Sequence, residues 1–130
     1  MPVIVQLVGS HRSGKTLTLT RVVRALRRRR LSVVVVKHSH HRIDLAGTDT
    51  DRYARSGATA VFFASDRTVG FLPGSALAWA RRLRPDVVLI EGDHRHRRGR
   101  RFVIGEPAAS AALAREIVAF VTERSPRRTR

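Results

Sequence analysis

The segment from Gly9 to Thr16 has the residue types and the spacing of a phosphate-binding loop. It reads Gly-Ser-His-Arg-Ser-Gly-Lys-Thr and matches the pattern G-x-x-x-x-G-K-[ST]. Gly14 lets the backbone approach a phosphate closely, the Lys15 ammonium can reach the β- and γ-phosphates, and the Thr16 hydroxyl can bind Mg²⁺. The alternative is an ordinary glycine-rich turn. The residues that we expect to bind a nucleotide here are Gly9, Arg12, Ser13, Gly14, Lys15 and Thr16.

Glu91 is the second candidate for chemistry, because it ends the apolar run 86–90. Ligands collect at the carboxyl ends of parallel strands. A carboxylate there can orient Mg²⁺ through a water or polarise an attacking water, so we assign Glu91 a catalytic and a metal-binding role; the alternative is a solvated acid. Asp86 lies at the other end of the run, more than about 15 Å away along an extended strand. We expect it to cap a turn after Pro85.

A polar segment between residues 37 and 52 supplies further candidates. It leaves the carboxyl end of a predicted strand, so it can fold over a bound phosphate. We expect Asp44 and Asp49 to hold Mg²⁺ or its waters, and Lys37 and Arg52 to neutralise phosphate charge. The alternative is a polar loop without a ligand.

Five of the six histidines fall into two clusters, at 38–41 and 94–96. Together they offer ligands for Zn²⁺ or Ni²⁺. No cysteine accompanies them, and no helical His-x-x-x-His face is evident. We therefore interpret them as surface histidines near an anionic ligand.

Strands and helices must position these residues, and the hydrophobic pattern predicts where they lie. The four valines at 33–36 predict a strand buried on both faces. Alternating strands and helices predict an α/β fold of P-loop NTPase type, with a mainly parallel sheet flanked by helices. We expect one domain over 1–124 and a disordered basic tail over 125–130. The predicted strands are 3–8, 32–36, 58–64, 68–72, 86–90 and 102–104, and the predicted helices are 15–30, 52–56, 75–83 and one that starts near 107–110.

Composition narrows the function classes. The chain has 130 residues and no cysteine, which excludes disulfides, cysteine zinc sites and thiol catalysis. No apolar stretch approaches the roughly 20 residues of a membrane span, and we expect a soluble cytoplasmic protein without membrane contact. The net charge is +16, but 24 of the 26 basic residues are arginine and asparagine is absent. This skew indicates a bias of the whole sequence, so the charge alone says little about partners.

The order of the motifs resembles the MobB family of molybdopterin-guanine dinucleotide biosynthesis adaptor proteins. The resemblance covers roughly residues 3–92. After the phosphate loop come Val-Val-Lys-His-Ser-His-His at 35–41, Asp-Leu-Ala-Gly-Thr-Asp-Thr-Asp-Arg at 44–52 and Ser-Gly-Ala at 56–58. The last part is Asp-Val-Val-Leu-Ile-Glu-Gly at 86–92. Family members usually continue with phenylalanine-lysine, whereas this chain continues with an arginine-rich loop.

The resemblance implies a P-loop protein that binds GTP, with ATP as the alternative nucleotide, and Mg²⁺. It implies that Gly14, Lys15 and Thr16 hold the nucleotide and the metal, and that Glu91 is the acidic residue of a Walker-B-like strand. It also implies weak hydrolysis at most, a homodimer, and a role beside the guanylyltransferase that attaches GMP to molybdopterin. The apolar segment 68–72 supports a dimer independently, because a strand at a sheet edge can pair with a symmetric copy.

Two other function classes share some of these features. A small-molecule kinase would use the same phosphate loop, with 95–101 as an arginine lid, but no acceptor-activating carboxylate stands out beyond Glu91. A nucleic-acid-binding module would use the arginines of 27–30, 95–101 and 127–130. Those arginines lie on different elements and no aromatic residues alternate with them, so nucleic acid is the less favoured partner.

Overall fold

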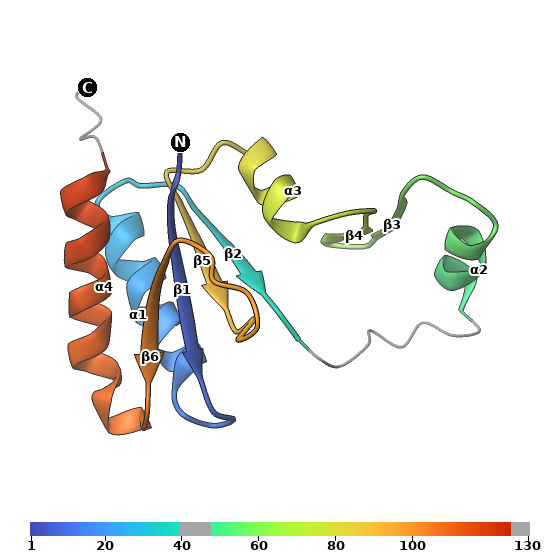
Figure 1. The fold of residues 1–130 in the computed structure, drawn as a ribbon. Coiled ribbons are helices and arrows are strands. Elements are labelled where there is room, and N and C mark those ends of the chain that lie inside the picture. The colour runs from blue at the N-terminus through green and yellow to red at the C-terminus, as the bar shows by residue number, and fades with distance from the viewer. Residues whose placement is uncertain (40–47, 126–130) are drawn as a thin grey trace. The chain divides into compact units, whose positions relative to one another are not determined.

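The computed structural model describes residues 1–39 and 48–125. Its chain divides into two compact units, of which the first comprises 1–39 and 76–130 and the second comprises 40–75 (Figure 1). We describe each unit by itself. The predictions for Asp44, for the histidines at 40–41 and for the tail after residue 125 lie outside the described residues.

The first unit contains a parallel sheet with the strand order β2-β5-β1-β6. The strands are β1 (Val3–Gly9), β2 (Val33–Lys37), β5 (Val87–Glu91) and β6 (Arg100–Ile104). Leu7 is paired with Glu91, and Glu91 with Lys37. Because all four strands run the same way, their carboxyl ends meet at one edge of the sheet. The predicted parallel sheet is therefore confirmed.

Helices cover both faces of this sheet. Helix α1 (Lys15–Arg28) and helix α4 (Ser110–Arg124), which follows the 3₁₀ turn η1 (Pro107–Ala109), lie side by side on one face (Figure 1). The short helix α3 (Ala76–Arg82) packs on the other. Side chains alternate between the faces, so Leu89 packs towards α1 and α4 while Val88 packs towards Ala80 of α3.

The second unit consists of helix α2 (Asp49–Arg55) and an antiparallel pair, β3 (Val61–Ala64) and β4 (Thr68–Phe71). The helix begins at 49 rather than at the expected 52, because the Thr48 hydroxyl caps it by accepting a bond from the Asp51 N–H at 3.3 Å. The predicted strand 58–64 starts only at Val61.

Three further expectations have different outcomes: one is wrong, one element starts earlier than expected, and one expectation is confirmed. The prediction that residues 33–36 are buried on both faces is wrong: β2 is an edge strand, and Val35 is 48% exposed. Strand β6 starts at Arg100 rather than 102, because residues 100 and 101 pair with β1. Asp86 caps a turn as predicted, since its carboxylate accepts bonds from the Ser32 N–H at 2.7 Å and hydroxyl at 3.0 Å.

None of the helices in the described ranges is long and apolar enough to cross a membrane.

Candidate functional site

The segment between β1 and α1 forms a tight loop that requires glycine at both of its ends. Gly14 has φ +99°, and a Cβ there would lie 3.0 Å from the Pro107 Cα. At Gly9, a Cβ would lie 2.7 Å from the Ile104 carbonyl oxygen. Helix α1 starts directly after the loop, with the Thr18 N–H donating to the Gly14 carbonyl at 2.9 Å. The backbone N–H groups at the start of α1 therefore face the loop with the positive end of the helix dipole.

Lys15, at the start of α1, and Glu91, at the end of β5, lie beside this loop. The Lys15 ammonium donates to the carbonyls of Gly9 at 2.7 Å and Ser10 at 3.0 Å, which places its charge at the loop backbone. The Thr16 hydroxyl donates to Glu91 Oε1 at 3.2 Å. The end of β5 therefore lies beside the phosphate loop, and the two side chains expected at Mg²⁺ are adjacent.

The Ser13 hydroxyl is a buried polar group that points to a ligand. Ser13 is 3% exposed, and its Oγ has no hydrogen-bond partner among the described residues. A buried hydroxyl without a partner costs about 1–3 kcal/mol, and a phosphate oxygen at this loop would satisfy it. The loop residues thus fit a phosphorylated nucleotide, and the Thr16 hydroxyl, phosphate oxygens and waters would hold Mg²⁺, with Glu91 beside them.

The other predicted site residues are divided between the two units. Lys37 ends β2 beside Glu91, at the same sheet edge as the loop. Asp49 and Arg52 belong to the second unit, where they form the first turns of α2. The structure therefore brings together Lys37, Glu91 and the loop residues of the first unit, whereas Asp49 and Arg52 lie in a separate unit.

The histidines at 94 and 96 follow Glu91 in the chain. In residues 1–39 and 48–125, no group of three or more His, Asp or Glu side chains could hold a metal ion. His96 Nδ1 instead lies 2.8 Å from Asp93 Oδ1, and Arg98 Nε lies 3.7 Å from the other oxygen. The hydrogen bond to His96 lowers the pKa of Asp93, assisted by the charges of His96, His38 and Arg98 and opposed by burial. Asp93 is therefore ionised at neutral pH.

Gln6 is a buried polar residue that the sequence reasoning missed. It is 0% exposed and lies in the middle of β1. Its Nε2 donates to the carbonyls of Gly92 at 2.9 Å, Asp93 at 2.8 Å and His96 at 2.9 Å. Its Oε1 accepts bonds from the backbone N–H of residue 98 at 3.1 Å and from Arg101 Nε at 3.0 Å. Its position as the one polar residue inside the apolar run 3–8 could have indicated a buried group that needs hydrogen-bond partners.

We expect Gln6→Met to loosen the segment after Glu91 without unfolding the sheet. Methionine has a similar length but cannot replace the hydrogen bonds, and unsatisfied buried groups cost about 1–3 kcal/mol each. Limited trypsin digestion should then cut the variant between residues 95 and 101 many times faster than the parent chain. An Arg24→Met variant serves as the control, because it introduces the same residue at an exposed position of α1. Equal cleavage of all three proteins in this segment would contradict the role given to Gln6.

The fold and the loop together define the class of protein. The sheet is parallel, a loop bounded by glycines connects its strand β1 to helix α1, and a carboxylate ends the neighbouring strand β5. This is the architecture of P-loop NTPase-type proteins. Within that class, the family of Molybdopterin guanine dinucleotide synthesis protein B, MobB, matches residues 4–123. The chain belongs to this family.

Individual relatives agree with the family match. A molybdopterin-guanine dinucleotide biosynthesis adapter protein of Haemophilus influenzae is 37% identical over 62 residues, which cover 46% of this chain and 35% of the relative. The chain therefore spans about a third of the length of that curated relative.

Solved structures of similar proteins have the same fold. The Bacillus subtilis MobB structure superposes with a TM-score of 0.60 at 26% identity, over 80% of this chain and 68% of that one. The MobB homolog from Bacillus stearothermophilus gives 0.56 at 26% identity, over 86% and 70%.

Proposed function

We propose that the chain binds GTP with Mg²⁺ at the phosphate loop, with ATP as the alternative nucleotide. The observation that carries the proposal is the cluster of Lys15, Thr16, the unpartnered Ser13 hydroxyl and Glu91 at one sheet edge. Lys15 and the backbone N–H groups would bind the β- and γ-phosphates, and Thr16 would hold the metal. Mg²⁺ would supply charge neutralisation between the phosphates. Gly9, Gly14 and Arg12 shape the loop, and Lys37 adds positive charge at the neighbouring strand end.

The pattern of residues 44–52 supports a further proposal, which rests on the sequence. Asp49 would hold Mg²⁺ or its waters, and Arg52 would neutralise phosphate. Asp44 would act with Asp49. Alanine at Arg52 should weaken GTP binding by less than alanine at Lys15.

We further propose that the chain is an adaptor for a molybdopterin guanylyltransferase, with slow GTP hydrolysis at most. Support comes from the family and from the Haemophilus influenzae relative, which is a biosynthesis adapter protein. A reconstituted assay tests this: molybdopterin, guanylyltransferase and Mg·GTP should yield more dinucleotide when the parent chain is added, but not when Lys15→Ala is added. An equal yield with and without the parent chain would count against the adaptor role. Since GTP is supplied in the cytoplasm, we propose that compartment.

A homodimer is the oligomeric state that we propose. In the second unit, Phe62, Phe63 and Val69 are 61%, 58% and 51% exposed on the two-stranded sheet. Isolated two-stranded sheets are marginally stable, and their edges leave backbone groups unpaired. Phe63 and Val69 are paired and share one face, while Phe62 lies on the other. A second copy can therefore cover apolar side chains on either face and pair with an edge.

Light scattering at micromolar concentration should therefore give about twice the 14.6 kDa of one chain. Phe62→Ser with Phe63→Ser should shift the mass towards the monomer, while Tyr53→Ser, which changes an exposed aromatic on α2, should not. A mass of one chain for the parent, with or without GTP, would rule the dimer out.

A further inference from the structure

The connection from β5 to β6 crosses the sheet without a helix. Strand β1 lies between β5 and β6, so residues 92–99 must pass over β1. They pass on the face to which Gln6 points, opposite α1 and α4. Parallel strands usually need a dozen or more residues for such a crossover. We call residues 93–99 the arginine strap.

The backbone of the arginine strap is held in one conformation. Gln6 binds it at both ends, and the Arg101 guanidinium donates to the carbonyls of His96 at 2.9 Å and His94 at 3.3 Å. Gly99 has φ +58°, and a side chain there would run into the Ile4 carbonyl. A bias towards arginine explains why arginines are frequent in this chain, but it does not explain a buried glutamine that fixes the loop carrying them.

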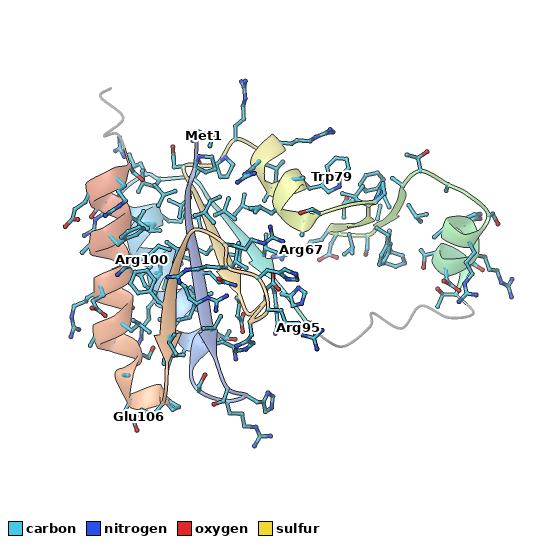
Figure 2. All side chains as sticks on the ribbon, viewed as in Figure 1. Met1, Arg67, Trp79, Arg95, Arg100 and Glu106 are labelled. Carbon is cyan, nitrogen blue, oxygen red and sulfur yellow. The ribbon has the colours of Figure 1, made fainter. Side chains whose placement is uncertain are left out.

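The strap exposes positive charge that the described residues do not neutralise. Arg95 and Arg97 are exposed, and no ion pair or hydrogen bond is found for their side chains in the described part of the chain. Asp93, the one acid of the strap, pairs with His96 and Arg98. Figure 2 shows Arg95 on the loop that follows β5. Two arginines therefore project from a rigid backbone next to the carboxyl end of the strand that carries Glu91.

The shape of the strap favours a protein surface as its ligand. The His96 N–H donates to the Asp93 carbonyl at 3.2 Å and closes a turn, with Arg95 at a central position. Side chains spread outwards from such a turn, which suits several separate carboxylates better than one enclosed phosphate. The strap contains no Phe, Tyr or Trp side chain for base stacking, and the neighbouring Phe102 packs edge-on against Phe120 with ring centroids 5.8 Å apart.

We infer that the arginine strap is a docking surface for an acidic patch on a partner protein, and, resting on the proposed function, that this partner is the guanylyltransferase. Rigid positioning of Arg95 and Arg97 lowers the entropy that is lost on docking. Charges at the rim of an interface mainly accelerate association and make it sensitive to salt. The strap lies at the end of β5, so docking would place the partner near the phosphate loop.

The test uses the full chain and the guanylyltransferase from the same organism. Arg95→Glu with Arg97→Glu should weaken binding at least about tenfold, mostly through the association rate, and should flatten its decrease between 50 and 200 mM salt. Arg24→Glu with Arg28→Glu makes the same change of charge at two exposed positions of α1, and its affinity for the guanylyltransferase should stay within about twofold of the parent. Biolayer interferometry in Mg·GTP measures both rates.

The outcomes separate this inference from the function on which it rests. Equal losses in both double variants would overturn the arginine strap as a specific surface and leave the adaptor role intact. If the parent chain does not bind the guanylyltransferase, the adaptor role and the docking surface both fail. If the strap variant loses only binding to a 20-nucleotide single-stranded DNA probe while partner binding is unchanged, the strap is a nucleic-acid surface and the inference is wrong.

Discussion

Lys15→Ala is expected to weaken binding of Mg·GTP by roughly 10- to 100-fold, whereas Lys37→Ala should weaken it by less than about threefold. The reason is position. Lys15 lies at the loop backbone, within 2.7 Å of the Gly9 carbonyl, where it can bond phosphate oxygens directly. Hydrogen bonds to charged groups contribute about 1.5–3 kcal/mol, and each 1.4 kcal/mol is about tenfold in affinity. Lys37 is exposed at the end of an edge strand and acts at longer range.

Titration of a fluorescent GTP analogue into both variants measures this difference. The Lys37 variant is the matched control, because it removes the same charge from the same sheet edge. Thermal melts of both proteins establish that each is folded before binding is compared. Equal, small losses for the two variants would remove the claim that the phosphate loop holds the nucleotide.

Glu91→Gln is expected to affect hydrolysis far more than binding. Most ground-state affinity comes from Lys15 and the backbone donors, so GTP affinity should stay within about tenfold of the parent, or about 1.4 kcal/mol. Glutamine keeps an oxygen that can accept the Thr16 bond seen at 3.2 Å, but it lacks the negative charge that would polarise an attacking water. If the chain hydrolyses GTP, the turnover of bound GTP should therefore fall by a larger factor than the affinity does.

Rapid filtration for binding and single-turnover phosphate release for chemistry separate the two effects. A collapse of binding with unchanged turnover per bound nucleotide would make Glu91 a ground-state ligand or a structural residue. If neither quantity changes, the carboxylate has no part in the site, although it lies beside Thr16.

The conformation of the loop 9–16 between a strand and a helix was predictable because its signals are local. A buried apolar strand, two glycines at fixed spacing and a lysine at a helix start stand next to one another in the chain. The position of Glu91 followed from one rule of parallel sheets, that carboxyl ends share an edge. The sheet then brought Thr16 and Glu91 together across 75 positions of sequence.

Other features depend on contacts that no local pattern carries. In the sequence, Gln6 is one polar residue in a predicted strand, and its hydrogen-bond partners lie 86 to 95 positions away in the chain. The valine run of β2 is apolar enough for a central strand, yet its neighbours place it at the edge, where Val35 is exposed. The hydrophobic pattern predicts that a segment is a strand, but the position of that strand in the sheet decides how much of it the neighbouring elements cover.

Isothermal titration calorimetry of Mg·GTP into the parent chain is the most direct test of nucleotide binding at the phosphate loop. We predict saturable binding of one GTP per chain and loss of the GTP signal in Lys15→Ala. An absence of saturable binding up to about 1 mM GTP by a folded parent chain, or full binding by Lys15→Ala, would contradict the account.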